Sequence, residues 1–238
     1  MTPNSSALTA SILSLGTRTD AATWKSGVES LGGTIVKEIR APVPSVSDIK
    51  SFFASDEQWL FIAGHFSNGE LYNQAHEDGD TANAVVIKFR NDRVILNHGT
   101  SAAVDLVKNA DFSQHINCKA VFWGGCNTNS NTGQVATFRT LFGNHTLIGW
   151  KGITGWQILN VVMGGFGNTA PNPSQDFFDR LGTDFADPTS IRTSWLDAAN
   201  EAQWGDSGQT EAKFSVIDPG GRGFRIHNNT VSPDPAFP

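Results

Sequence analysis

Two short apolar runs, each followed by glycine and then by a side chain that can exchange a proton, constrain the fold of this chain most. The first runs from Trp59 to Ala63 and continues into Gly64-His65, and the second runs from Ala120 to Trp123 and continues into Gly124-Gly125-Cys126. Such runs are typical of strands buried on both faces, as in parallel sheets. In open α/β sheets, ligands bind at the carboxyl ends of the strands. If the two strands are parallel neighbours, His65 and Cys126 leave the same edge of the sheet and can meet.

A histidine and a cysteine at one sheet edge suit nucleophilic catalysis. The thiolate is the reactive form of cysteine, and it needs a neighbouring base or a favourable dipole. A helix is expected after Cys126, and the dipole at its N-terminus favours a thiolate. Each residue also has an ordinary alternative, because a free cysteine usually behaves as a small buried hydrophobe and a histidine can be a hydrogen-bonded loop residue. Their shared position after two similar strands leads us to predict His65 and Cys126 as a catalytic dyad, with no chemical role for Cys118.

The bulk properties bound the class of protein. With 238 residues, 39% of them hydrophobic, the chain suits one large globular domain. We expect a flexible N-terminus at 1–9, a single domain at 10–230 and a flexible C-terminal tail at 231–238. The net charge of -6 and the absence of a basic cluster argue against nucleic acid or an anionic membrane as a partner. No apolar stretch reaches the roughly 18 residues of a membrane span. Without a signal-peptide pattern or a disulfide framework, a cytoplasmic location is expected.

Hydrophobic periodicity predicts the order of elements. In the first half, strands near 12–16, 34–39 and 59–63 alternate with helices at 20–31 and from 46 onward, which favours a parallel sheet with right-handed crossovers. A polar loop at 67–83 follows, then a hairpin with arms at 84–89 and 93–96, and then a helix at 101–109. After Cys126 we expect a helix at 132–141, a strand at 146–150, helices at 156–166, 174–181 and 190–204, and a hairpin formed by 213–217 and 224–226.

The two blocks resemble those of a known family. An apolar run with Gly-His, followed after a longer gap by an apolar run with Gly-Cys, resembles the caspase-like (clan CD) cysteine peptidases. The stretch from Phe122 to Asn129, with Cys126-Asn127-Thr128 at its centre, looks most similar to the CHAT family, whose nucleophile block commonly reads Cys-Asn-Thr-Gly. The resemblance implies an α/β fold of the caspase-like kind: a three-layer sandwich with a mostly parallel central sheet and an inserted β-hairpin.

The resemblance also implies an activity. It implies a cysteine endopeptidase that acts on a peptide or protein substrate through an acyl-enzyme and needs no cofactor. Cys126 is then the nucleophile and His65 the general acid, and the backbone N–H groups of Phe66 and Cys126 form the oxyanion hole. Trp150 and Trp156 follow a strand end, so they are candidates for lining the substrate cleft.

One departure from the family pattern leaves an alternative open. The family usually carries glycine after the histidine, and this chain carries Phe66. Either Phe66 keeps an ordinary φ with its N–H aimed at the cleft, or its ring closes the cleft until a partner moves it. The alternative function is therefore a catalytically silent caspase-like scaffold or sensor that binds a regulatory protein partner.

Other signals in the sequence are weaker. The string from Gly165 to Ala170 matches a dinucleotide fingerprint, but prolines follow where the helix should begin. The acidic run from Glu77 to Asp80 is expected to be a solvated loop. The remaining histidines lack the spacing of metal ligands, so no metal site is predicted.

Overall fold

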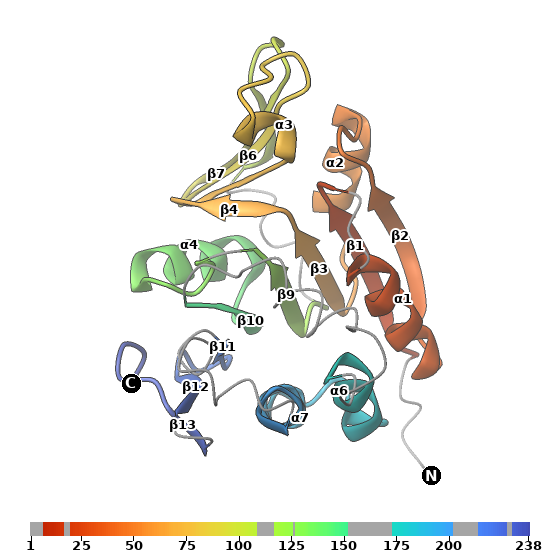
Figure 1. Ribbon diagram of the computed structural model, residues 1–238, viewed down its shortest axis with the longest axis vertical. Coiled ribbons are helices and arrows are strands. Elements are labelled where there is room, and N and C mark those ends of the chain that lie inside the picture. The colour runs from red at the N-terminus through yellow and green to blue at the C-terminus, as the bar shows by residue number, and fades with distance from the viewer. Residues whose placement is uncertain are drawn as a thin grey trace.

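The computed structural model is built on a mixed central sheet that carries the two apolar runs side by side (Figure 1). It describes residues 7–16, 20–108, 117–125, 127–151, 173–201, 214–227 and 230–238. Within them the central sheet has eight strands in the order β13-β12-β11-β10-β9-β3-β1-β2. Its first five strands in the chain are β1 (Thr9–Ser14), β2 (Thr34–Arg40), β3 (Trp59–Ala63), β9 (Ala120–Gly124) and β10 (Thr146–Trp150). These five strands run parallel to one another, which confirms the predicted parallel centre.

Three antiparallel strands extend the central sheet beyond β10. They are β11 (Phe214–Ile217), β12 (Gly223–His227) and β13 (Thr230–Pro233). The first two form the hairpin predicted near the C-terminus, with its turn at Asp218-Pro219-Gly220-Gly221, where Gly221 takes a positive φ of 94°. A turn rich in Asp, Pro and Gly reverses the chain without strain.

Helices cover both faces of the central sheet. The helices α1 (Asp20–Ser30), α6 (Pro173–Leu181) and α7 (Pro188–Glu201) share a core with one face, and α2 (Val46–Phe53) and α4 (Thr132–Phe142) share a core with the other. Successive residues of β3 and β9 enter opposite cores because side chains alternate along a strand. This is why both strands read as continuously apolar, and it makes the molecule a three-layer α/β protein.

The helix starts follow the capping signals in the sequence. Ser45 caps α2, and its hydroxyl accepts a hydrogen bond from the Asp48 N–H at 3.1 Å. Asn131 caps α4 through the Gln134 N–H at 2.7 Å. In each case a side-chain oxygen satisfies a backbone donor that the first turn leaves unpaired.

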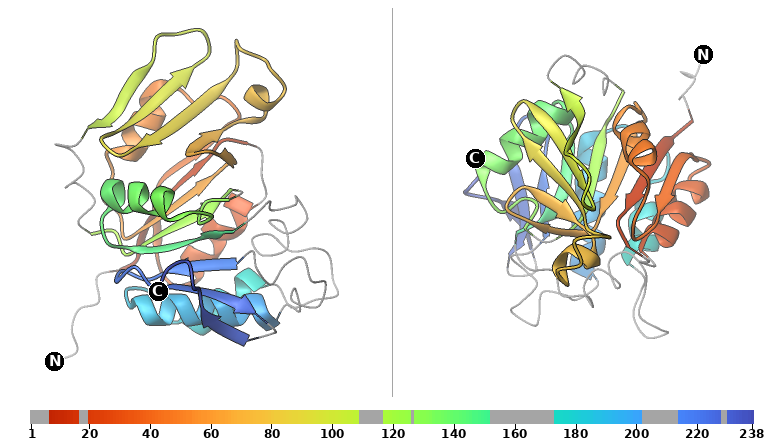
Figure 2. Two further views of the ribbon diagram at one scale, coloured as in Figure 1. Left: turned by 90° about the vertical axis from the view of Figure 1, so that its left-hand side faces the viewer. Right: turned by 90° about the horizontal axis from the view of Figure 1, so that it is seen from above.

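A second sheet lies between β3 and β9 in the sequence. It is antiparallel, with the strand order β4-β5-β6-β7-β8. Its strands are β4 (His65–Ser67), β5 (Glu70–Tyr72), β6 (Val85–Arg90), β7 (Arg93–His98) and β8 (Val104–Lys108), and a short helix, α3 (Gln74–Glu77), joins β5 to β6. One face packs onto α2, α4 and the central sheet. The left view of Figure 2 places this second sheet and the helices α6 and α7 at opposite ends of the molecule.

The second sheet corrects two predictions. The hairpin predicted at 84–96 exists as β6 and β7, but it belongs to a five-stranded sheet rather than standing alone. The helix predicted at 101–109 is wrong, because residues 104–108 form β8 and pair with β7 from Leu96↔Val104 to Arg93↔Lys108. Pairing with an existing strand edge overrides the weak helical periodicity of this segment.

Both domain boundaries also differ from expectation. Leu8 is buried and its carbonyl accepts a hydrogen bond from the Thr34 N–H at 2.8 Å, so the folded domain begins before residue 10. The C-terminal tail expected at 231–238 is not loose. It completes β13, and Phe237 then packs back into the core while its carbonyl accepts from the Gly223 N–H at 2.7 Å.

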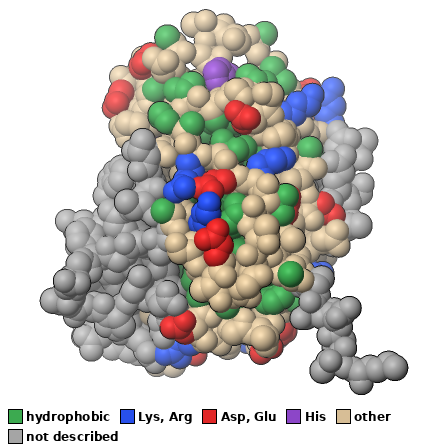
Figure 3. Space-filling model, turned by 90° about the vertical axis from the view of Figure 1, so that its right-hand side faces the viewer, with side chains coloured by type: hydrophobic (Ala, Val, Ile, Leu, Met, Phe, Trp, Pro, Cys, Tyr) green, Lys and Arg blue, Asp and Glu red, His purple; other side chains and the backbone are tan. Residues whose placement is uncertain are grey.

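The exposed edge of the central sheet at β2 carries alternating charges. Figure 3 shows acidic and basic side chains interleaved on this side of the molecule. Glu38 of β2 pairs with Lys25 at 2.9 Å and also with Arg40. Charged side chains on an edge strand oppose pairing with another chain. No helix within the described ranges is long and apolar enough to cross a membrane.

Candidate active site

The ends of β3 and β9 lie next to each other, as the sequence predicted. The two strands are parallel, with Ala63 directly opposite Gly124, and the Gly64 N–H donates to the Gly124 carbonyl at 3.4 Å. A Cβ added to Gly125 would lie 2.8 Å from the Cβ of Phe66, so only glycine allows the turn after β9 to approach β4 this closely. Cys126 itself lies outside the described residues. Gly125, which leads from β9 to Cys126, therefore packs directly against β4, the strand that carries His65.

His65 is the first residue of β4 and is held by two neighbours. Its Nε2 lies 2.9 Å from Oε1 of Gln74. Its ring stacks on the ring of Tyr72, which is its register partner on β5, with centroids 5.6 Å apart and planes inclined by 14°. The side chain is half-buried, so it is both fixed and accessible. A general acid or base needs this combination of defined orientation and access to substrate.

Phe66 adopts the ordinary backbone of a strand. The described non-glycine residues with positive φ are Asn68 and Asn127. The Phe66 ring is buried between Phe89, Trp123 and Phe138, at centroid distances of 6.3, 5.8 and 5.8 Å. It links the second sheet to β9 and α4. The ordinary φ expected for this residue is confirmed.

The register of β4 also fixes where the backbone of Phe66 points. Asn68 and Gly69 form a two-residue turn with φ of 50° and 76°, flanked by Ser67 opposite Glu70. Residues flanking such a turn form a hydrogen-bonded pair, and bonded and non-bonded pairs alternate along the ladder. Phe66 opposite Leu71 is then a non-bonded pair, and the Phe66 N–H faces away from β5. This is the orientation that an oxyanion donor at the strand edge requires.

The loop that follows Cys126 is held by buried polar contacts. Thr128 and Asn129 are fully buried. The Trp150 N–H donates to Oγ1 of Thr128 at 3.0 Å, and the Asn129 N–H donates to the Trp150 carbonyl at 2.9 Å. The side-chain amide of Gln134 donates to the Thr128 carbonyl at 2.7 Å. A Cβ on Gly149 would lie 2.4 Å from Oγ1 of Thr128, so glycine at that position lets the loop close over β10.

The two tryptophans expected at the cleft have different outcomes. Trp150 is buried, with 1% of its surface exposed, and its indole N–H donates to the Trp123 carbonyl at 2.9 Å. The structure therefore places Trp150 in the core and not along an open cleft. A buried indole needs such a partner for its N–H. Trp156 lies outside the described residues.

A polar cavity of about 310 Å³ flanks this region between the β4–β5 turn and the start of α4. Its walls carry amide groups from Asn68, Asn131 and Gln134, together with the guanidinium group of Arg90. Arg90 is already paired with Glu70 at 3.0 Å. The cavity suits a polar side chain or a peptide group more than an apolar one.

Cys118, the other cysteine of the chain, has a buried thiol. It is buried at the start of the β9 segment, and its thiol donates to the Ala120 carbonyl at a sulfur–oxygen distance of 3.6 Å. Burial raises the pKa of this thiol far above its usual range. A thiol whose pKa is raised by burial is a poor nucleophile, because the thiolate is the reactive form.

Sequence reasoning missed the residues that hold His65, because it treated residues 67–83 as a polar loop. The dipeptide Asn68-Gly69 is a strong signal for a two-residue hairpin, with Phe66 and Leu71 as inward residues on either side. That signal predicts Tyr72 opposite His65. The contact from Gln74 depends on α3 and has no signature in the sequence.

The chain matches no protein-family model, and no curated protein sequence matches it. Within the described ranges, no three side chains of His, Cys, Asp or Glu gather in a way that could hold a metal ion. The described site thus consists of a held histidine at one strand end, a sharply turning chain at the neighbouring strand end, and a fixed loop beyond it.

Proposed function

We propose that this protein is a cysteine endopeptidase of the caspase-like, CHAT type, with His65 and Cys126 as its dyad. The observation that carries the proposal is the parallel register of β3 and β9, which brings the segments after Ala63 and Gly124 to one sheet edge. The half-buried, hydrogen-bonded His65 and the outward-facing N–H of Phe66 support it further. A peptide or protein is the substrate, and no cofactor enters the reaction.

In the proposed mechanism, the Cys126 thiol gives its proton to His65 and the thiolate attacks the scissile carbonyl carbon. The carbon–sulfur bond forms, and the N–H groups of Phe66 and Cys126 stabilise the negative oxygen. His65 then passes its proton to the leaving amine as the carbon–nitrogen bond breaks, which leaves an acyl-enzyme. Water attacks the acyl-enzyme, gives a proton to His65, and releases the carboxylic acid as the thiol re-forms.

The test is cleavage of a peptide library by the purified chain, read by mass spectrometry. Turnover should be lost in Cys126→Ala and in His65→Ala and retained in Cys118→Ala, which removes the other thiol. An iodoacetamide label followed by peptide mapping should modify Cys126 well before Cys118, because burial keeps Cys118 protonated. If neither thiol reacts selectively and no peptide is cleaved, the chain is the silent scaffold and the proposal fails.

A further inference from the structure

His65 is the end of a short chain of side-chain hydrogen bonds. Its Nε2 lies 2.9 Å from Oε1 of Gln74, and Nε2 of Gln74 donates to Oδ1 of Asp78 at 2.9 Å. A carboxylate can only accept hydrogen bonds, so the Gln74 group that faces Asp78 is the NH2. The group that faces His65 is therefore the amide oxygen, which also can only accept. It follows that Nε2 of His65 carries a proton and Nδ1 is the nitrogen with a free lone pair in the neutral ring.

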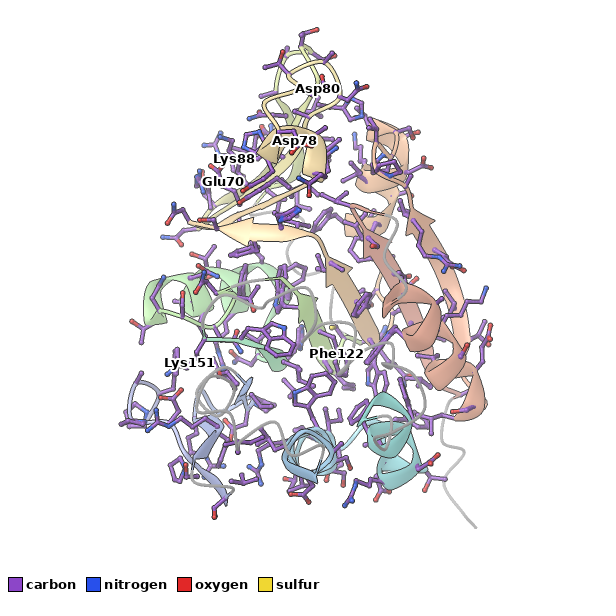
Figure 4. The ribbon with its side chains drawn as sticks, in the orientation of Figure 1. Glu70, Asp78, Asp80, Lys88, Phe122 and Lys151 are labelled. Carbon is purple, nitrogen blue, oxygen red and sulfur yellow. The ribbon has the colours of Figure 1, made fainter. Side chains whose placement is uncertain are left out.

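The segment that carries Gln74 and Asp78 is anchored to the rest of the molecule by hydrogen bonds. Gln74 and Asp78 are one helical turn apart, and the Asp78 N–H donates to the Gln74 carbonyl at 2.9 Å. The preceding residue, Asn73, is buried; its Oδ1 accepts from the Val85 N–H at 3.0 Å, and its Nδ2 donates to the Pro42 carbonyl at 2.7 Å. Figure 4 shows Asp78 at the end of α3. Gln74 is thus presented to His65 by an anchored segment.

Tyr72 removes the other freedom of the imidazole. Its ring stacks on His65, and the ring of His76 meets the Tyr72 ring edge-on, with centroids 5.0 Å apart. Stacking limits rotation of the His65 ring, and the bond to Gln74 selects which nitrogen is protonated. A histidine that exchanges protons with a thiol must present a defined nitrogen to it.

We propose that Gln74, oriented by Asp78, is a positioning residue that fixes His65 in the tautomer with Nε2 protonated, so that Nδ1 exchanges the proton with Cys126. This role rests on the proposed peptidase function, but the tautomer itself does not. Asp78 holds the Gln74 amide in this orientation, because its carboxylate accepts from the NH2 group and keeps that group turned away from His65.

The decisive variant is Asp78→Lys. An ammonium group can only donate, so the introduced lysine favours the opposite amide orientation: Gln74 accepts from the ammonium group and donates to Nε2 of His65. Because Nε2 then accepts a hydrogen bond, the neutral ring carries its proton on Nδ1. In protein with 15N-labelled histidine, NMR should show His65 with Nε2 protonated in the native chain and a shift toward Nδ1 protonation in Asp78→Lys. The His65 signal is assigned by its absence in His65→Gln.

The matched control is Glu77→Lys, which makes the same charge change at the neighbouring exposed position of α3. It should leave the tautomer as in the native chain. Gln74→Met, which removes the acceptor, should lower the population with Nε2 protonated without inverting it. Far-UV circular dichroism and melting curves confirm that each variant is folded.

Turnover supplies the second measurement. Asp78→Lys should lower kcat by about 10-fold or more with little change in KM, because it affects proton transfer and not substrate binding. Glu77→Lys should leave both values unchanged. If Asp78→Lys leaves the His65 tautomer as in the native chain, or the native ring is protonated at Nδ1, the positioning role is wrong even in an active peptidase. If the tautomer responds as expected in a chain that cleaves no peptide, the peptidase proposal fails, and the positioning role in catalysis fails with it.

Discussion

The central sheet and the second sheet are built on different patterns of burial. Every residue of β3 and β9 is buried, whereas β4 and β5 bury only their middle residues and turn the others outward. The central sheet has a core on both faces, and the second sheet has a core on one. Burial of the central sheet on both faces fixes where the ends of β3 and β9 meet. Burial of the second sheet on one face leaves its other face outward, and there His65 and Tyr72 orient each other. Position and orientation at the candidate site therefore come from different sheets.

The largest effect of substitution should fall in the central sheet. Phe122 packs on Trp24, Trp59 and Phe177, with centroid distances of 4.1, 5.1 and 5.9 Å. Phe122→Ala should lower the free energy of unfolding by about 3–5 kcal/mol, because it leaves a cavity among these rings. The matched variant Ile95→Ala, on the outward face of β7, should cost under about 1.5 kcal/mol. Urea denaturation measures the free energy of unfolding of both variants. Equal losses would contradict the different burial that we assign to the two positions.

Phe66 joins the two sheets, so its truncation should come next in size. Phe66→Ala should cost about 3 kcal/mol, since the ring is buried against Phe89, Trp123 and Phe138. Phe66→Leu keeps an apolar side chain in place and should cost under about 1.5 kcal/mol. Thermal melts of the two variants provide the measurement. If Phe66→Ala is neutral for stability and raises peptide turnover, the ring closes the cleft and its packing role is wrong.

The sequence predicted the central sheet better than the second one, for a physical reason. A strand buried on both faces must be apolar throughout, so β3 and β9 were recognisable from the sequence. The strands β4 and β5 have three residues each, and each shows only one inward side chain, Phe66 or Leu71. Two alternations are too few to identify a strand by periodicity.

The same limit explains the missed partners of His65 and the misassigned C-terminus. The hydrogen bond from His65 to Gln74 forms only after the chain reverses at Asn68-Gly69 and enters α3. The C-terminal segment has a polar, proline-containing sequence, and it is ordered by contacts with distant parts of the chain. Its carboxylate at Asp234 meets Lys151 at the end of β10, which no local pattern can indicate.

The pair formed by Lys151 and Asp234 is buried and should matter more than its single contact suggests. Asp234 is 1% exposed, and the Lys151 ammonium also lies 5.3 Å from the centroid of the Phe237 ring. Lys151→Met leaves a carboxylate buried without its cation, which should lower the free energy of unfolding by about 2–3 kcal/mol. Urea denaturation of Lys151→Met and Lys151→Arg tests this, with Arg expected to retain most of the stability. A loss below about 0.5 kcal/mol in Lys151→Met would mean that the pair is solvated.

The smallest effect should come from the ion pairs on the outward face of the second sheet. Glu70 lies 3.1 Å from Nζ of Lys88 and 3.0 Å from Nη2 of Arg90, and Figure 4 shows Glu70 and Lys88 adjacent on this face. All three side chains are partly exposed, so water and salt screen the attraction. Glu70→Gln should cost less than about 1 kcal/mol, and the loss should shrink further in high salt. Both Glu70→Gln and Lys151→Met replace a charged side chain of an ion pair by a neutral one, and the two sites differ in burial. If Glu70→Gln lowers the free energy of unfolding as much as Lys151→Met does, the difference in exposure between the two ion pairs does not determine their contribution to stability. If it costs little, the outward face that carries His65 can change its charges without loss of fold, and variants such as Asp78→Lys can be interpreted by their effect on the histidine alone.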